Sequence, residues 1–474
     1  MEQPVTDPQM PSVVDAAAQV RAGERSAVAL TEQCLGVIAS RNPELNAFVY
    51  LDADGALEAA AAVDARVAAG EDPGPLAGVP FGVKDLDDCA GMPTTHGSRW
   101  YLGGPPVEHD SLHVGRLRAA GAIPLGKTAT PEFGTFGYTA SPALGVTRNP
   151  WNPQRTPGGS SGGSAAAISA GMVPFATASD GGGSTRSPAG FCGLVGLKGS
   201  YGRIPDITAG RYGQTAVAGA LATTVADSAR LLDVMAGSHR RDRSSLPDPT
   251  VRYEDAIETL DVRGMKAAWS SDLGFAIVDP EVAEIAHAAF EALVAAGNLT
   301  LDARPIAFRD PIPVWARTGG ADMFVHIPDG CWPDRADELD PLVRPGFESA
   351  ARVTLAKFGS LLRARLAIED AMADTFDAVD VLATPMTAIT AFAAEGPMPT
   401  EVMGQRVHGG MSVPFAMLAN IWGSPAISVP AGVTAEGLPV GLHLMADRHR
   451  EDVCLRLARV LEQARPWPLR APVR

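Results

Sequence analysis

The chain has 474 residues, of which 46% are hydrophobic and 20% charged, the balance of a soluble globular protein with a large core. Its net charge of −15 argues against nucleic acid as the main partner, because phosphate binding needs clustered Lys and Arg. No run is apolar enough to span a bilayer, and MEQPVTDPQM at the start lacks the features of a secretory signal. The five cysteines are scattered, odd in number and without a CxxC pair, which favours reduced thiols in a cytoplasm.

Hydrophobic periodicity predicts alternating helices and strands, and therefore a layered α/β sheet. Helical spacing predicts four helices before residue 171: 13–38 (ended by Pro43), 54–69, 111–120 and 164–170. Short apolar runs predict buried strands: 76–85, 122–125, 173–178, 265–269, 381–384 and 426–429.

The second half of the chain has one clear helix and two less regular segments. Asp279 can cap a helix that begins with Pro280, and Gly297 closes it. The polar segment 238–252 is predicted to be a surface connection between two halves. The elements of 305–410 cannot be ordered from the pattern.

Glycine is concentrated between Gly158 and Gly219, where two glycine-serine segments stand out: 156–164 (TPGGSSGGS) and 179–188 (SDGGGSTRSP). Such stretches can be flexible linkers, but both run into apolar elements, as linkers do not. A serine behind three glycines is open to a substrate, and the glycine N–H groups can converge on an oxyanion. The spacing alone leaves both interpretations open.

A nucleophilic serine needs a base. None of the nine histidines lies in an apolar or glycine-rich context near these serines. Lys84 ends an apolar run, and burial favours the neutral form of a lysine. A salt bridge between Lys84 and the adjacent Asp85 is the simpler interpretation on these residues alone.

Together these segments resemble the amidase signature family, in the order that the family shows. The resemblance covers most of the chain and is carried by the following segments: 76–85 (LAGVPFGVKD), 121–133 (GAIPLGKTATPEF), 147–151, 158–163, 180–203 and 422–441. It implies one α/β/α domain over 1–474, with a central mixed, twisted β-sheet covered by helices on both faces. Its core signature region is 76–203, and 305–410 is expected to contribute to the substrate pocket.

The resemblance also implies site roles. Ser184 matches the acylated serine, Ser160 the bridging serine that follows a cis peptide bond, and Lys84 the general base. Lys84 would draw a proton from Ser160, and Ser160 one from Ser184. The implied oxyanion hole consists of the N–H groups around four residues: Gly181, Gly182, Gly183 and Ser184. The family frequently has Thr or Ile at Gly181, but the backbone donor survives that difference.

Asp180 and Arg186 are expected to brace the nucleophile loop rather than to react, with the Asp180 carboxylate accepting backbone N–H bonds. No cofactor and no metal is implied. A weaker hypothesis places four aromatic residues in the substrate pocket, although ordinary core packing explains them nearly as well: Phe133, Phe136, Tyr138 and Trp422.

The implied function is hydrolysis of linear, non-peptide amides of small neutral or hydrophobic molecules, extending to esters, anilides or carbamates. A homodimer is also expected from the family. The alternative is the glutaminase (A) subunit of a tRNA-dependent amidotransferase. That class usually has Gln at Ser187 and Pro-Thr at Gly199-Ser200, and no clamp for the carboxylate of glutamine is evident. A scaffold that has lost activity would not be expected to retain the three catalytic residues.

Three further patterns are weighed and set aside. Residues 121–128 (GAIPLGKT) match the P-loop expression, but that loop must follow a strand and open a helix, and here Pro131 follows. His109 and His113 have the spacing of a helical metal pair, but their polar neighbours favour a solvated loop leading into a helix. Cys192 lies in an apolar setting and is expected to be a small buried residue.

Overall fold

The computed structural model describes residues 10–206, 214–325 and 327–472. Its long sheet is built from these strands: β1 (Phe48–Leu51), β2 (Pro80–Lys84), β3 (Ile123–Thr128), β6 (Phe175–Asp180), β7 (Val195–Lys198), β8 (Val217–Ala222), β9 (Lys266–Trp269), β10 (Thr300–Asp302), β11 (Val381–Pro385), β14 (Ala426–Val433) and β15 (Pro439–Ala446). Two separate two-stranded sheets pair β4 (Ala140–Ser141) with β5 (Gly145–Val146), and β12 (Glu401–Val402) with β13 (Gln405–Arg406).

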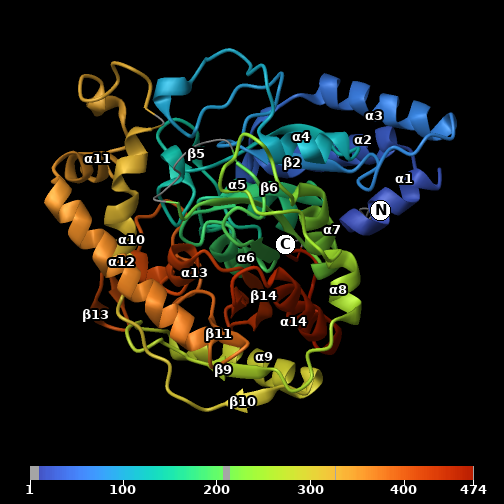
Figure 1. Cartoon of the computed structure of the whole chain (residues 1–474). Helices are drawn as coiled ribbons and strands as arrows, with labels where there is room; N and C mark the ends of the chain where they lie inside the picture. Colours follow the sequence, from blue (N-terminus) through green and yellow to red (C-terminus); the bar gives the residue numbers. More distant parts are fainter. Residues whose placement is uncertain (1–9, 207–213, 326, 473–474) are drawn as a thin grey trace.

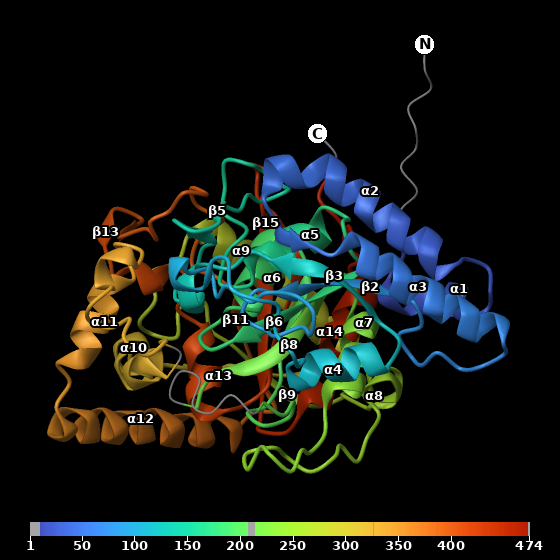
Figure 2. The same cartoon turned by 90° about the horizontal axis from the view of Figure 1, so that it is seen from above.

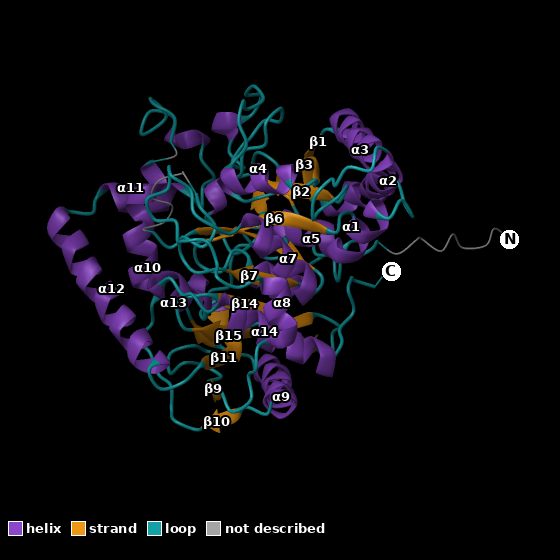
Figure 3. Ribbon diagram, turned by 45° about the vertical axis from the view of Figure 1, so that its right-hand side comes forward, coloured by secondary structure: helices purple, strands orange, loops and turns teal. Residues whose placement is uncertain are grey.

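Within the described residues the long sheet has eleven strands, in the spatial order β1-β3-β2-β6-β8-β7-β14-β15-β11-β9-β10. Strand β2 runs parallel to β3 and β6, and β9 runs parallel to β10 and β11, whereas the other neighbours are antiparallel. The predicted mixed sheet is therefore confirmed. Figure 3 shows it as a band that ends at β1 and β3 on one side and at β9 and β10 on the other.

Helices surround this sheet, and none in the described part of the chain combines the length and apolar character needed to cross a bilayer. Their bounds are α1 (Val13–Arg21), α2 (Ala27–Leu45), α3 (Ala53–Ala68), α4 (Leu112–Ala119), α5 (Gly162–Ser169), α6 (Arg186–Cys192), α7 (Val225–Met235), α8 (Tyr253–Thr259), α9 (Pro280–Gly297), α10 (Ile312–Thr318), α11 (Arg344–Ala351), α12 (Leu355–Phe376), α13 (Ala416–Trp422) and α14 (Glu451–Ala464). Helices α10 to α12 and helices α1 to α3 lie at opposite ends of the molecule (Figures 1 and 2).

Both faces of the sheet are covered, as strand β15 shows. All eight of its residues are buried. Because side chains alternate along a strand, Leu442 and Leu444 face the main core, which also contains residues of α9 and α14. Gly441 lies on the opposite face, where an added Cβ would come within 3.0 Å of the Cα of Gly190 in α6. Helix α6 can therefore lie directly on the sheet and carry its N-terminal end to the site.

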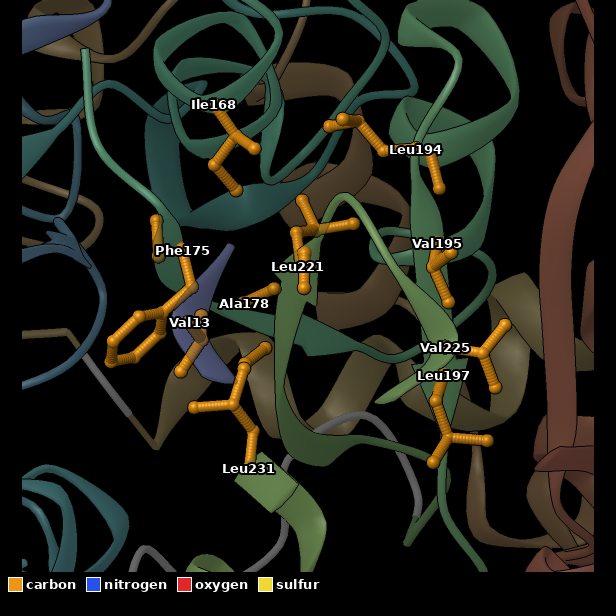
Figure 4. Close-up of a cluster of buried hydrophobic side chains, with 14 of the residues drawn as sticks. Val13, Ile168, Phe175, Ala178, Leu194, Val195, Leu197, Leu221, Val225 and Leu231 are labelled. Carbon is orange, nitrogen blue, oxygen red and sulfur yellow. The ribbon is translucent and has the colours of Figure 1, made fainter. Parts of the chain in front are cut away.

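The centre of the main core joins elements from distant parts of the chain. Figure 4 shows Val13 of α1, Phe175 of β6, Leu221 of β8 and Leu231 of α7 meeting in one apolar cluster. Each of these side chains is at most 1% exposed. The packing of this cluster holds β6 in position, and it thereby also positions the start of the loop that follows β6.

The predicted first helix is wrong in its limits. The chain forms two helices, because Gly23 adopts a positive φ of 68° and Ser26 then caps α2 by accepting from the N–H of Ala29. Pro43 does not end α2, which continues to Leu45 and closes at Asn46 in the left-handed conformation. A proline in the last turn removes a single hydrogen bond, which the packing of a long helix can tolerate.

One of the two irregular segments of the second half agrees with expectation and the other differs from it. Segment 238–252 joins α7 to α8 and contains no buried residue. The long-sheet strands that precede it form one side of the sheet, from β1 to β7 in the spatial order, and those that follow it form the other side, from β14 to β10. The predicted surface connection between two halves is therefore confirmed. The two halves of the chain meet within the sheet, where Lys198 of β7 pairs with Ala426 of β14. Segment 305–410 contains α10, α11 and the 22-residue α12 and is therefore substantially helical. Helix 279–297 and the predicted strands are confirmed.

The first glycine-serine segment is not a linker, because its glycines touch other backbone. A Cβ on Gly163 would lie 2.2 Å from the N atom of Ala129. A Cβ on Gly159 would lie 2.5 Å from the O atom of Phe136. Only glycine allows this segment to pack so closely against the chain around β3 and the loop after it.

We predict that Gly163→Ala lowers the free energy of unfolding by about 1–3 kcal/mol, because backbone atoms cannot yield to the new methyl group. Gly36→Ala is the matched control, since Gly36 lies within α2 and a Cβ there meets nothing within 4 Å. That change should raise the stability by about 0.5–1 kcal/mol. Chemical denaturation of both variants tests the pair, and equal effects would contradict the packing described.

Candidate active site

The candidate site lies at the carboxyl ends of two neighbouring parallel strands. Lys84 is the last residue of β2, and Asp180 is the last residue of β6. Ligands of open α/β sheets commonly bind at this edge. The second glycine-serine segment begins in the last two residues of β6 and runs into α6, while the first runs into α5. The contacts of Lys84 described below bring both segments to one place.

Lys84 has no solvent exposure, and its amine is surrounded by hydroxyl groups. Its Nζ lies 2.8 Å from Ser160 Oγ, 2.8 Å from Ser161 Oγ and 3.0 Å from Ser179 Oγ. The alternative salt bridge with Asp85 is wrong, because Asp85 faces Lys127 at 3.7 Å. The amine therefore contacts both glycine-serine segments, the first through Ser160 and Ser161 and the second through Ser179.

Ser160 and Ser184 line the same cavity. The peptide bond between Gly159 and Ser160 is cis, as the family resemblance implies. The backbone holds the two segments together, since the N–H of Ser161 donates to the carbonyl of Ser184 at 3.2 Å. In the described part of the chain no hydrogen bond joins the hydroxyls of Ser160 and Ser184, so that step of the relay stays a prediction. Catalytic hydrogen bonds often tighten only when substrate binds.

Asp180 organises the loop that carries Ser184 from inside the protein. Its carboxylate accepts from the N–H of Gly183 (2.7 Å) and forms a two-pronged pair with Arg186, through Nε and Nη2 at 2.9 Å each. Burial alone would raise the pKa of Asp180, but the charge and hydrogen bonds of Arg186, with one from Asn420, hold that pKa well below its usual range. The expected bracing role of Asp180 and Arg186 agrees with these contacts.

A buried histidine that was not expected from the sequence contacts the Asp180–Arg186 pair. His443 lies in β15 with no exposure, and burial, followed by the nearby Arg186 charge, lowers its pKa well below the usual value. Because a guanidinium can only donate, His443 Nε2 accepts from Arg186 Nη1 at 2.9 Å. No histidine was assigned to the site from the sequence, whereas His443 contacts Arg186 and His96 lines the cavity.

The predicted oxyanion donors are not equivalent. Gly181, Gly182 and Ser184 line the cavity, whereas the N–H of Gly183 already donates to Asp180. We therefore remove Gly183 from the set of donors. This position requires glycine for steric reasons, because its φ is 114° and an added Cβ would lie 2.6 Å from the Cβ of Ala416. The carbonyl of Gly181 accepts from the indole N–H of Trp315 at 2.6 Å, so Trp315 fixes this loop from α10.

The cavity has a volume of about 340 Å³. Phe133 and Phe136 line it, as predicted, but Tyr138 and Trp422 do not. Tyr138 is buried in a separate apolar cluster with Phe191 and Phe392, and Trp422 stacks on Phe376 with ring centroids 5.0 Å apart. Segment 305–410 supplies much of the remaining wall, as expected, through these residues: Ile312, Trp315, Ala316, Gly319, Met323, Leu342, Val343, Gly346, Met398 and Gly410.

The three patterns set aside have structural explanations. Residues 123–128 of the P-loop match form the buried strand β3, and Lys127 donates to the carbonyl of Asp87 within the interior. His109 is exposed, but the expected solvated setting is wrong for His113, which is buried 3.3 Å from Asp87. Cys192 is buried, and burial raises the pKa of its thiol. Among the described residues no group of three or more His, Cys, Asp or Glu could hold a metal.

Known proteins match the chain along nearly its whole length. The family model described as Amidase matches residues 29–455. An acylamidase of Rhodococcus erythropolis is 35% identical, with 97% of each chain covered. The A subunit of the glutamyl-tRNA(Gln) amidotransferase of a Cyanothece species is also 35% identical, covering 98% of this chain and 100% of the relative. The crystal structure of a bacterial aryl acylamidase of the amidase signature enzymes matches with a TM-score of 0.90, at 28% identity over 97% of both chains.

We predict that Asp180→Asn lowers the free energy of unfolding by about 3–5 kcal/mol, because it leaves the buried Arg186 charge uncompensated. The folded-state pKa of Asp180 is depressed, so its stabilisation is present above the unfolded value of about 3.9 and is lost as pH falls through the folded value. The difference between wild type and variant should therefore be constant above about pH 5 and shrink in more acidic solution.

Asp261→Asn is the control for this change, because the Asp261–Arg263 pair is largely exposed. Denaturation midpoints measured between pH 3 and pH 8 should show no effect of that substitution. An Asp180→Asn protein as stable as wild type at pH 7 would contradict the bracing role.

Proposed function

Because the chain belongs to the amidase signature family, we propose that it is a stand-alone amidohydrolase for small, neutral or hydrophobic amides. One observation carries this proposal. Among the described residues that line the cavity there is no Asp, Glu, Lys or Arg. A charged substrate group enclosed there would lose its hydration without gaining a counter-charge from these residues, which is unfavourable. Uncharged amides with apolar bodies fit such walls.

The proposed chemistry begins with a proton relay. Uncharged Lys84 accepts the proton of Ser160 across the 2.8 Å contact between Nζ and Oγ. Ser160 in turn accepts the proton of Ser184, whose oxygen attacks the carbonyl carbon of the amide. The complete burial of Lys84 among three hydroxyls supports this direction of transfer, because loss of hydration disfavours the charged form of an amine.

Collapse of the tetrahedral intermediate completes the first half of the reaction. The N–H groups of Gly181, Gly182 and Ser184 are proposed to hold the oxyanion, and Trp315 keeps Gly181 in place through its carbonyl. The relay then runs backwards and protonates the leaving amine, which departs and leaves an acyl ester on Ser184. Water repeats the sequence and releases the acid. Esters, anilides and carbamates pass through the same kind of intermediate, so the relay admits them as substrates.

The second candidate is the glutaminase component of an amidotransferase, which the 35% identity to the Cyanothece protein favours. Free glutamine carries both an α-carboxylate and an α-ammonium group. Recognition of such a zwitterion calls for charged partners at the pocket wall. The described lining residues provide none, and this supports the stand-alone hydrolase.

A substrate panel separates the two functions. The purified chain is incubated alone with a 4-nitroanilide, a short aliphatic amide, an ester, a carbamate and L-glutamine, and the released amine, alcohol or ammonia is measured. The proposal expects turnover of neutral anilides or amides without a partner protein. Ammonia release confined to glutamine would instead identify the amidotransferase function.

We predict that Lys84→Met lowers kcat/KM on amides by about 10²–10⁴-fold, because the relay loses its base. Ser160→Ala should have a comparable effect. Ser161→Ala is the matched control, since Ser161 also lies 2.8 Å from Lys84 but does not line the cavity. It should lose at least about tenfold less than Ser160→Ala.

Steady-state kinetics of the three variants on one anilide, with circular dichroism to verify folding, provide the comparison. A Ser161→Ala variant as impaired as Ser160→Ala would show that Ser160 has no special role. A Lys84→Met variant with wild-type activity would contradict the proposed relay.

A further inference from the structure

One hydroxyl group at the cavity wall has no role in the proposed relay. Ser187 belongs to the first turn of α6 and lines the cavity together with Ser184. Its side chain is 1% exposed, and its Oγ has no hydrogen-bond partner among the described residues. The N–H of Ser187 donates to the carbonyl of Gly183 at 2.7 Å, so the helical turn starts within the nucleophile loop and holds the hydroxyl beside it.

The other polar side chains around Ser184 already have partners. The hydroxyls of Ser160 and Ser179 receive hydrogen bonds from Lys84. The hydroxyl of Thr135 donates to the carbonyl of Glu132, and the indole N–H of Trp315 donates to Gly181. Ser187 therefore differs from these four residues in having no side-chain hydrogen bond at all within the described part of the chain.

The surroundings of Ser187 explain why the protein leaves it unpaired. A Cβ built on Gly183 would come within 2.9 Å of Ser187 Oγ, so the hydroxyl rests against the bare Cα of a glycine. Nearby parts of the wall are apolar and include Ile312, Val413 and Met417. A buried hydroxyl is unfavourable until it is paired, and a ligand in the cavity is positioned to pair with it.

We propose that Ser187 Oγ is a recognition point for one uncharged polar group of the substrate, such as an ether, hydroxyl or carbonyl close to the scissile amide. This inference rests on the proposed function and narrows its substrate class: a neutral amide with an apolar body and a single hydrogen-bonding group next to the bond that is cut. The hydroxyl can donate to an ether or carbonyl oxygen and can accept from a hydroxyl. Ser187 is thus a specificity residue, distinct from the relay.

The test uses pairs of anilides that differ in one atom or group. Butyryl 4-nitroanilide and methoxyacetyl 4-nitroanilide have chains of equal length, with a methylene in one replaced by an ether oxygen in the other. A second pair compares an N-acetyl-4-toluidine with an N-acetyl-4-aminophenol and so places the polar group on the amine side. The quantity measured is the ratio of kcat/KM between the polar and apolar members of each pair.

In the wild type we expect the polar member of at least one pair to be favoured by about tenfold, the contribution of one hydrogen bond to a ligand. Ser187→Ala should bring that ratio close to one. Ser428→Ala is the control, because Ser428 is also buried with an unpaired Oγ but does not line the cavity. Its ratio should match that of the wild type.

Equal rates for both members of both pairs in the wild type overturn the inference and leave the hydrolase function intact. A preference that survives in Ser187→Ala also overturns it. If the wild type cleaves none of the four compounds, the proposed function fails for anilides, and the inference that depends on it fails too. Equal wild-type rates overturn the inference even where the alanine variant folds poorly.

Discussion

The structure of the site depends on one buried amine held by hydroxyl groups. Lys84 has no contact with solvent, and Ser160, Ser161 and Ser179 lie within 3.0 Å of its Nζ. A fully buried amine depends on hydrogen-bond partners that the backbone holds in position, because solvent cannot replace them. The close packing of Gly159 and Gly163 against neighbouring backbone provides that positioning. Glycine in this segment therefore serves rigidity rather than flexibility.

A second interaction fixes the nucleophile loop and links the two halves of the chain. The Asp180–Arg186 pair lies between β6 and α6, and Arg186 also contacts Asn420 of α13 and His443 of β15. His443 accepts from Arg186, and its depressed pKa, caused first by burial and then by the Arg186 charge, keeps the imidazole neutral. The C-terminal half of the chain thus supports the loop of the N-terminal half that carries Ser184, the proposed nucleophile. The two halves also share one sheet, because β7 of the first half pairs with β14 of the second.

Local sequence pointed to part of this site and not to the rest. Lys84, Ser160 and Ser184 lie at the end of a short apolar run and in glycine-rich turns, but these patterns left other interpretations open. Only the resemblance to the amidase signature family gave the three residues their expected roles. Tyr138 and Trp422 were wrongly assigned to the pocket, because an aromatic side chain fits a core or a cavity equally well and tertiary contacts decide between them. Trp315 and His443 were missed for the same reason: their partners Gly181 and Arg186 lie 134 and 257 residues away in the chain. The 22-residue α12 went unpredicted because its buried stripe is narrow, with Leu361, Ile368, Met372 and Phe376 as its only buried positions.

The central claim is that Lys84 and Ser160 act as one proton path to Ser184. A double-mutant cycle tests this directly: kcat/KM on one anilide is measured for the wild type, Lys84→Met, Ser160→Ala and the variant carrying both changes. If the two residues belong to one path, the double variant should be no slower than the slower single variant, because the path is already broken. Losses that multiply in the double variant would show that the two residues act independently and would contradict the relay.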